Sequence, residues 1–150
     1  MKPIELYAEI LKNENYPPIA GKILGLFYTS DQKYFTFEEI MEQINASKSA
    51  TSKALKILLD TGEVNFMIKE KSKRRRLFYM DIEGCKQRIY SSVSAYGTYY
   101  ALLKDTLNKR SGNNEELNSY MKSEIKFWEE TLEFIKDRIT SNFDIPFDKN

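Results

Sequence analysis

Histidine is absent from this sequence of 150 residues, and cysteine occurs only once, as Cys85. Without histidine, the chain lacks the side chain that most often performs acid–base chemistry near neutral pH and most often binds metal ions. A single cysteine excludes an intrachain disulfide, which favours a reducing compartment. The sequence has no nucleophile motif and no phosphate-binding loop, and the adjacent Glu129 and Glu130 fit a solvated helix face better than a catalytic pair. We therefore expect a protein that is not an enzyme and needs no cofactor.

Long hydrophobic runs are also missing. The apolar stretches are far too short to span a bilayer, and residues 1–9 carry no cleavable signal pattern. We therefore expect a soluble, cytoplasmic protein. With 41% hydrophobic residues, the chain is long enough to bury one ordinary core and to carry an appended helical piece.

Positive charge is concentrated in the middle of the chain, although the formal net charge is only +1. Residues 1–44 hold four basic and seven acidic residues, residues 45–80 hold nine and three, and residues 81–150 hold ten and twelve. The middle segment therefore carries the positive field that attracts nucleic-acid phosphates.

This basic segment has the pattern of a helix followed by a hairpin. Ser47 is a suitable helix N-cap, because its hydroxyl can accept a hydrogen bond from an unpaired amide in the first turn. Gly62 suits the left-handed position that ends such a helix. Two strands are predicted next, at residues 64–68 and 77–80, joined by a basic tip at residues 69–74. The buried stripe of the helix is expected to contain Thr51, Leu55, Leu58 and Leu59.

Two helices are predicted at the start of the chain, over residues 3–13 and 18–29. The apolar spacing of the first would turn Ile10 inward. Gly21 and Gly25 lie one turn apart in the second, which predicts that another helix packs closely against it.

A third short helix, over residues 37–44, is predicted from its start signal. Thr36 followed three residues later by Glu39 has the spacing of a capping box. A short strand is expected at residues 34–36, beside the hairpin. Only a tight turn separates the third helix from the Ser47 helix, so the pair forms a helix-turn-helix. With the basic hairpin as a wing, this predicts a winged helix-turn-helix that binds DNA.

Two long amphipathic helices are predicted in the rest of the chain. The first runs from about residue 83 to 110, with an apolar face that includes Ile89 and Tyr96. The second follows a stop at residues 111–113, with Asn113 as its N-cap. Its inner seam is expected to contain Leu117, Met121, Ile125, Trp128, Leu132, Ile135 and Ile139.

Tyr120, Phe127 and Phe134 extend the apolar surface of the second long helix beyond this seam. A helix that is apolar on more than one face has more than one neighbour. An antiparallel hairpin would use one seam and leave the other available for another subunit. We therefore expect this region to form a homodimer.

The residues predicted to contact DNA lie on the exposed side of the Ser47 helix and in the hairpin. Lysine and arginine neutralise phosphates with release of counterions, and a recognition helix can read base edges in the major groove. A basic hairpin can also serve only to keep an edge strand from pairing, but the lysines of the preceding helix favour DNA. Which of them reads bases is left open. The predicted contacts are Ser47, Lys48, Ser49, Ser52, Lys53 and Lys56 in the helix, and Lys71, Lys73, Arg74, Arg75 and Arg76 in the hairpin.

Aromatic residues in the two long helices allow a second kind of site. Tyr96, Tyr99, Tyr100 and Trp128, with Tyr90 nearby, could form an aromatic box for a cationic small-molecule effector, because ring faces attract positive charge. Packing between helices, with the hydroxyls at the solvent edge, is the simpler interpretation. Cys85 similarly fits a small buried apolar residue better than a redox sensor.

The block from Pro18 to Leu26 resembles the start of the winged-helix domain in GbsR-type regulators, a branch of the MarR family. Residues 37–40, 45–55 and 58–64 follow the same pattern, so the resemblance covers about residues 4–80. Beyond them only the general plan of two or more long helices is similar.

The resemblance implies a homodimeric transcriptional regulator, with its recognition helix at residues 47–61 and its wing at residues 64–80. Terminal helices would dimerise, and repression by blocking a promoter is the commoner mode in that family. Some relatives respond to choline-like molecules, but no residue of this chain matches a ligand motif, so the effector's identity stays open.

These observations predict a mainly α protein with a winged helix-turn-helix DNA-binding domain at residues 1–81. A long helical hairpin for dimerisation is expected at residues 82–140 and a tail at residues 141–150. The expected function is that of a sequence-specific regulator of transcription, a repressor that binds near-palindromic double-stranded DNA as a homodimer. The alternative is a winged helix that holds a protein partner through its basic patch, without specific DNA binding.

Overall fold

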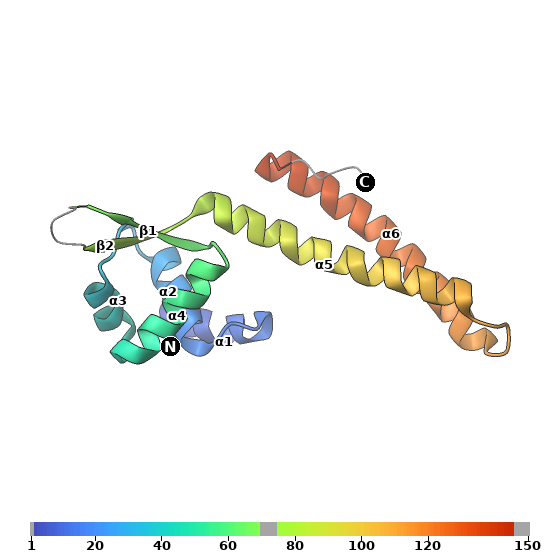
Figure 1. Cartoon of the computed structure of the whole chain (residues 1–150), viewed down its shortest axis with the longest axis horizontal. Helices are drawn as coiled ribbons and strands as arrows, with labels where there is room; N and C mark the ends of the chain where they lie inside the picture. Colours follow the sequence, from blue (N-terminus) through green and yellow to red (C-terminus); the bar gives the residue numbers. More distant parts are fainter. Residues whose placement is uncertain (1, 70–74, 146–150) are drawn as a thin grey trace. The chain divides into compact units, whose positions relative to one another are not determined.

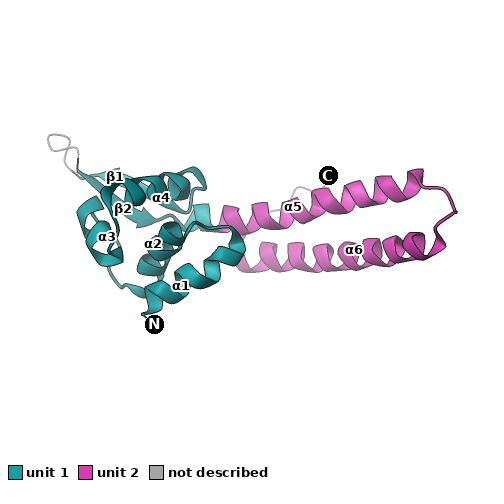
Figure 2. Cartoon of the chain, turned by 90° about the horizontal axis from the view of Figure 1, so that it is seen from below, with its two compact units in different colours: residues 1–85 teal, residues 86–150 magenta. Residues whose placement is uncertain are grey.

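The computed structural model describes residues 2–69 and 75–145, and the chain divides into two compact units, residues 1–85 and 86–150 (Figure 2). Unit 1 contains α1 (Pro3–Leu11), the 3-10 turn η1 (Lys12–Glu14), α2 (Pro18–Thr29), α3 (Phe37–Ile44), α4 (Lys48–Asp60), β1 (Val64–Ile68) and β2 (Arg76–Met80). Helix α5 (Ile82–Lys109) begins in unit 1 and continues into unit 2, which also contains α6 (Glu115–Phe143) (Figure 1). A winged helix followed by a long helical hairpin confirms the predicted fold class.

Helix α2 is the centre of the core of unit 1, and α1 packs directly on its two glycines. A Cβ atom on Gly21 would lie 2.9 Å from the Ala8 Cα, and one on Gly25 would lie 2.8 Å from the Tyr7 Cβ. Only glycine permits this separation, which confirms the predicted close approach of two helices. Ile10, in contrast, is exposed rather than inward, because Ala8 occupies the contact with α2.

The helix-turn-helix is formed by α3 and α4, and both helices begin as their sequence signals predict. Thr36 and Glu39 form a complete capping box at the start of α3. The Ser47 hydroxyl accepts a hydrogen bond from the amide of Ala50 at 3.2 Å, which caps α4. Between the two helices, Asn45 adopts the left-handed conformation that a tight turn requires, with φ of 50°.

Strands β1 and β2 form an antiparallel hairpin in which Val64 pairs with Met80 and Ile68 with Arg76. The second strand begins at Arg76, one residue earlier than predicted, because Arg76 takes part in the ladder. Phe35 adds an isolated antiparallel bridge to Phe78 on the outer side of β2. The expected short strand beside the wing is therefore reduced to one residue.

The end of α4 is joined to the start of α5 by a compact polar cluster in unit 1. Glu63 is only 6% exposed, and its carboxylate accepts hydrogen bonds from the Tyr16 hydroxyl at 2.5 Å and the Thr61 hydroxyl at 3.1 Å. Gly62, with φ of 81°, ends α4 as predicted. The carbonyl of Gly62 lies where any Cβ on Gly84 would have to be, so the first turn of α5 sits directly on this corner.

Unit 2 consists of the antiparallel helices α5 and α6. Met121, Ile125, Leu132 and Ile139 are buried, as predicted for the inner seam of α6. Leu117 was also predicted to lie in this seam, but it is exposed because it lies in the first turn of the helix. The apolar face predicted for α5 is wrong in part, because Ile89 and Tyr96 are largely exposed. None of the helices in the described part of the chain is long and apolar enough to cross a membrane.

The start of α6 differs from the prediction by one residue. Asn114, not Asn113, is the N-cap, and its side chain accepts a hydrogen bond from the amide of Leu117 at 3.1 Å. This places Glu115 and Glu116 in the first turn, where their negative charge favours the positive end of the helix dipole.

Candidate nucleic-acid interface

Helix α4 separates its apolar and polar side chains onto opposite faces. Thr51, Ala54, Leu55 and Leu58 are buried in the core of unit 1, and Leu59 is half-buried. The side chains predicted to contact DNA are exposed on the other face, namely Ser47, Lys48, Ser49, Ser52, Lys53 and Lys56. Of these, Ser47 already uses its hydroxyl oxygen as the helix cap, which leaves its hydroxyl proton available for an acceptor.

Part of this face meets the base of the wing in an open hollow of about 450 Å³, which we call the α4–wing hollow. Lys48 and Ser52 line it from α4, Arg76 lines it as the first residue of β2, and Arg75 lines it from the position just before that strand. Phe37, Glu38 and Phe78 complete its wall. Two pairs of predicted DNA contacts, more than twenty residues apart in sequence, therefore lie around one cavity.

A second hollow of about 280 Å³ lies further along α4 and shares several of the same residues. It is lined by Ser52, Lys56 and Asp60 of α4, and again by Arg76. Together the two hollows follow the exposed face of α4 from its first turn to its last, on the side that faces β2.

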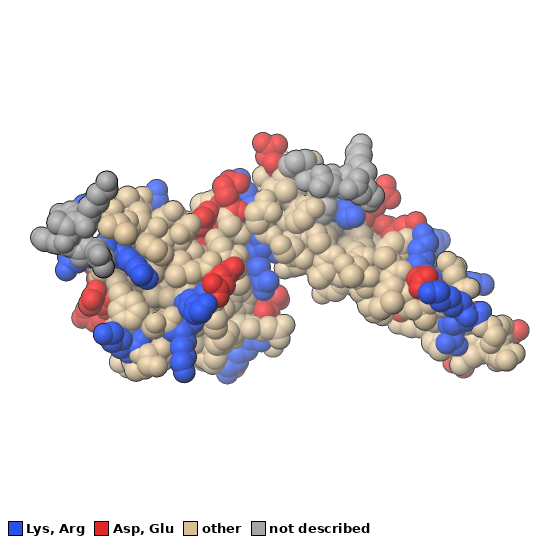
Figure 3. Space-filling view, in the orientation of Figure 1, with Lys and Arg blue, Asp and Glu red and all other residues tan. Residues whose placement is uncertain are grey.

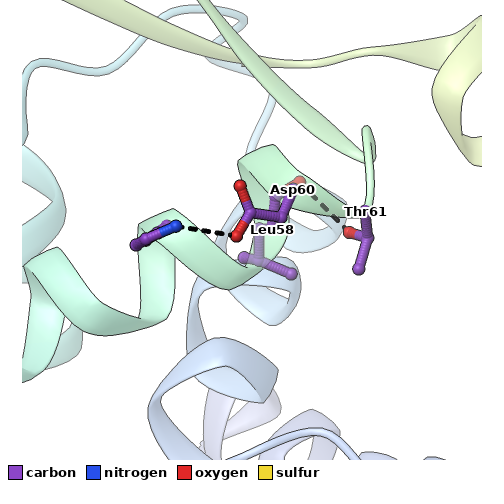
Figure 4. A network of polar contacts seen from close by, with 4 residues as sticks. Leu58, Asp60 and Thr61 are labelled. Carbon is purple, nitrogen blue, oxygen red and sulfur yellow. Dashed lines mark hydrogen bonds and ion pairs between the residues drawn. The ribbon is translucent and has the colours of Figure 1, made fainter.

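Lys56 has an acidic partner within this region. Its Nζ lies 3.0 Å from the Asp60 carboxylate, one helical turn away, and both side chains are well exposed. Figure 4 shows Asp60 at the end of α4, beside Thr61, whose hydroxyl oxygen lies 3.1 Å from the carbonyl oxygen of Leu58. The charge of Lys56 is therefore partly offset in the free protein.

Arg76 is held over an aromatic ring. The centre of its guanidinium lies 4.7 Å from the centroid of the Phe66 ring on β1, within the range of a cation–π contact. This contact orients the side chain along the wing without using its five hydrogen-bond donors. Lys71, Lys73 and Arg74 lie outside the described residues.

Lysine and arginine side chains gather on the side of unit 1 that carries α4, as Figure 3 shows, with acidic groups among them. The basic groups are not a uniform patch, since Glu38 and Asp60 line the two hollows. Four cationic side chains and two carboxylates therefore line this surface.

The aromatic residues of unit 2 come together only in part. The Tyr96 ring stacks on Trp128 at 5.0 Å, and Tyr99 meets Trp128 edge-on at 6.4 Å. Glu124 accepts hydrogen bonds from the Tyr99 hydroxyl at 3.1 Å and from the Trp128 Nε1 at 3.4 Å. The hydrogen bond to this carboxylate raises the pKa of Tyr99 above its usual value. Because two rings stack directly on each other, they fill the space that a boxed ligand would need.

Tyr100 lies apart from this group. The Lys104 Nζ is 5.5 Å from the centroid of its ring, and Tyr100 lines an open hollow of about 720 Å³ between α5 and α6. Glu129 and Glu133 of α6 line the same hollow. The four predicted ligand residues are thus divided between a packed cluster and a separate cavity.

Comparison with solved structures found a protein with a similar fold. The chain is similar to a protein described as a transcriptional regulator in its crystal structure, with 14% sequence identity and a TM-score of 0.69 over 97% of this chain and 98% of the other. The two proteins share a fold. Nearly the whole of both chains takes part in this likeness, including the helices that follow the wing.

Looser likenesses exist to a MarR family transcriptional regulator from Silicibacter pomeroyi and to S. aureus MepR in its DNA-binding conformation. The first is 16% identical, with a TM-score of 0.44 over 82% of this chain and 79% of the other. The second is 20% identical, with a TM-score of 0.45 over 83% and 86%. Searches of protein-family profiles and of curated proteins each found no match.

Sequence reasoning missed three kinds of residue in this region. Asp60 could have been found, because its spacing from Lys56 is that of a helical ion pair. The sequence does not mark Glu38 or the rings of Phe37 and Phe78 as part of this site. They line it only because α3, α4 and β2 come together in the folded unit.

Proposed function

We propose that this protein is a DNA-binding regulator of transcription that uses α4 as its recognition helix and the β1–β2 hairpin as its wing. The α4–wing hollow carries this proposal, because Lys48, Ser52, Arg75 and Arg76 converge there from two elements. A DNA backbone offers phosphates at regular spacing, and several cations around one cavity can hold it in register. The exposed residues of α4 would then reach base edges in the major groove.

In this proposal, the protein acts as a homodimer on a near-palindromic DNA site. A two-fold axis between two copies would present two α4 helices to half-sites one helical turn apart, about 34–36 Å. Binding across a promoter would then block transcription, which makes the protein a repressor. The block from Pro18 to Leu26 supports a place in the GbsR-type branch of the MarR family.

Fluorescence anisotropy with a labelled random duplex at low salt tests DNA binding directly. A variant with Lys48, Lys53 and Lys56 all replaced by alanine should lose most of its affinity, because three cations leave the exposed face of α4. Replacing Lys109, Lys122 and Lys126 in unit 2 by alanine removes the same charge elsewhere and is the matched control. Full affinity in the first variant, or equal losses in both, would rule out α4 as the recognition helix.

The wing is tested by the salt dependence of the same binding. Arg75→Ala should lower the slope of log affinity against log salt concentration by about one, the value expected for one lost phosphate contact. An unchanged slope would place Arg75 off the DNA. If the wild-type protein binds no duplex even at low salt, a winged helix that holds a protein partner through the same basic surface replaces this proposal.

A cationic effector site beside Tyr96, Tyr99, Tyr100 and Trp128 stays a prediction. Trp128 is the only tryptophan of the chain, so its fluorescence reports on this site without labelling. Saturable quenching by a tetramethylammonium probe, abolished by Tyr96→Ala, would support the site. Fluorescence that does not respond would leave the rings with a packing role alone.

A further inference from the structure

Three aromatic side chains of α6 lie on the surface. Tyr120 is 59% exposed, Phe127 56% and Phe134 66%. Large aromatic rings normally contribute much of the apolar area that proteins bury, and a row of them left in water is unusual for a monomer. These three follow one another at intervals of seven residues.

The exposed rings form a face of α6 that is separate from its buried one. Each residue of a helix is turned by about 100° from the last, so residues seven apart differ by only about 20°. Tyr120, Phe127 and Phe134 therefore share one face. The buried Met121 and Leu132 lie about 120° and 140° around the helix from Phe127 on the same reckoning.

The residues along this face are arranged symmetrically about Phe127. Seven residues before it stands Tyr120, and seven after it Phe134. Four residues before it stands Ser123, and four after it Thr131. At eleven residues the two sides carry opposite charges. We call this set the outer stripe of α6, and its members are Glu116, Tyr120, Ser123, Phe127, Thr131, Phe134 and Arg138.

We propose that the outer stripe pairs with the outer stripe of a second copy of this chain, antiparallel, about a two-fold axis that passes beside Phe127. Phe127 then packs on its own copy, and Tyr120 packs on Phe134 of the other chain. This interface is isologous, so each patch is its own complement. It deepens the homodimer of the proposed function by assigning which surface joins the two copies and in which direction.

Charge decides between the two directions in which two such helices can pair. In the antiparallel pair, Glu116 of each chain faces Arg138 of the other, which gives two opposite-charge contacts. In a parallel pair, Glu116 would face Glu116 and Arg138 would face Arg138, and like charges repel. Both residues are exposed, so both are available for a partner.

The size of the patch fits the centre of an interface. Six aromatic side chains exposed to this degree would remove roughly 700 Å² from water on pairing. A stable interface usually buries about 1,200–2,000 Å² in total. The outer stripe would therefore supply the central apolar part, and single changes at its ends should weaken the dimer without abolishing it.

Cysteine crosslinking tests the predicted register. In a Cys85→Ala background, Phe127→Cys should form a disulfide-linked dimer under mild oxidation, because facing Cα atoms of two packed helices lie close enough for a disulfide. Tyr120→Cys alone should not crosslink, since its two copies would lie about 21 Å apart along the helices. A mixture of Tyr120→Cys and Phe134→Cys proteins should crosslink to each other. Lys122→Cys, which points away from the stripe, is the control.

Charge reversal provides a second readout. Glu116→Arg and Arg138→Glu should each weaken dimerisation about tenfold in analytical ultracentrifugation, because two contacts per dimer become repulsive. The double variant should restore it. Failure of the double variant to recover affinity would overturn the antiparallel pairing.

The outcomes separate this inference from the proposed function. A dimer in which Phe127→Cys does not crosslink, or in which Lys122→Cys crosslinks equally well, overturns the outer stripe but leaves the DNA-binding homodimer. A wild-type protein that stays monomeric both free and on DNA overturns the homodimer itself. Crosslinking at Phe127 without DNA binding supports the stripe and removes the proposed function.

Discussion

Glu63 contacts three parts of unit 1 through hydrogen bonds of its side chain and backbone. Its carboxylate accepts from Tyr16, which precedes α2, and from Thr61, which ends α4. Its backbone carbonyl lies 3.8 Å from the Cys85 sulfur at the start of α5. Buried polar groups of this kind are costly unless satisfied, so Glu63 fixes how the end of the proposed recognition helix meets its neighbours.

Cys85 illustrates the effect of this environment on a single thiol. Burial, together with the negative charges of Glu63 and Asp81, raises the pKa of Cys85 to about 11. A raised pKa keeps the thiol protonated, and only the thiolate reacts with alkylating agents.

We therefore predict that iodoacetamide modifies the folded protein at pH 8 about a hundredfold more slowly than a thiol with an ordinary pKa of 9.0. The rate should keep rising until the pH approaches 11. Mass spectrometry measures it, with the urea-unfolded protein as the reference. A rate that levels off near pH 9 would contradict this environment.

The effect of the Asp60 carboxylate on DNA affinity can be measured with a single substitution. This carboxylate pairs with Lys56 and lines a hollow whose other charged side chains are Lys56 and Arg76. Asp60→Asn removes this charge and releases Lys56, so affinity for duplex DNA at low salt should rise about threefold, with a steeper salt slope.

Asp105→Asn is the matched control for this change. Asp105 pairs with Lys109 at 2.7 Å in the same one-turn spacing, but on α5 of unit 2. Equal effects of both substitutions on anisotropy would show that only the net charge matters. Weaker binding by Asp60→Asn would mean that the carboxylate itself contacts the DNA.

At the scale of single elements, helix α5 contains one glycine with no room for a side chain and one with open space around it. A Cβ on Gly84 would lie 1.7 Å from the Gly62 carbonyl oxygen, whereas a Cβ on Gly97 would have nothing within 4 Å. No neighbour therefore requires a glycine at position 97. Gly84 is the glycine that a neighbour requires, although no local sequence signal marks it.

We predict that Gly84→Ala lowers the free energy of unfolding by about 2 kcal/mol or more, because backbone atoms must move apart. Gly97→Ala in the same helix should raise it by about 0.5–1 kcal/mol, because alanine is the better helix former. Urea unfolding followed by circular dichroism measures both. A Gly84→Ala protein as stable as the wild type would exclude the contact with Gly62.

Element boundaries were largely predictable from sequence, because they depend on local chemistry. Thr36, Glu39, Ser47 and Gly62 act within their own turns, and each was assigned correctly. Contacts between elements were not predictable to the same degree. Glu38 reaches the α4–wing hollow only because α3 and β2 meet there, and nothing local marks it.

For the whole molecule, the proposed function requires a fixed spacing between the two half-sites of the DNA. Two α4 helices related by a two-fold axis fit half-sites one turn apart. Once a bound sequence has been selected from genomic fragments, inserting five base pairs between its half-sites should turn one half-site to the opposite face. Affinity should then fall to that of a single half-site. Unchanged affinity would show that the two copies do not bind DNA together.

The outer stripe of α6 also predicts how two positions should vary together among homologous sequences. Glu116 and Arg138 are separated by 22 residues of one helix, roughly 33 Å, so they cannot touch within a chain. If they meet across a two-fold axis, a charge change at one position is tolerated only with a compensating change at the other. Homologous sequences should therefore covary at these two positions, although no contact inside a single subunit links them.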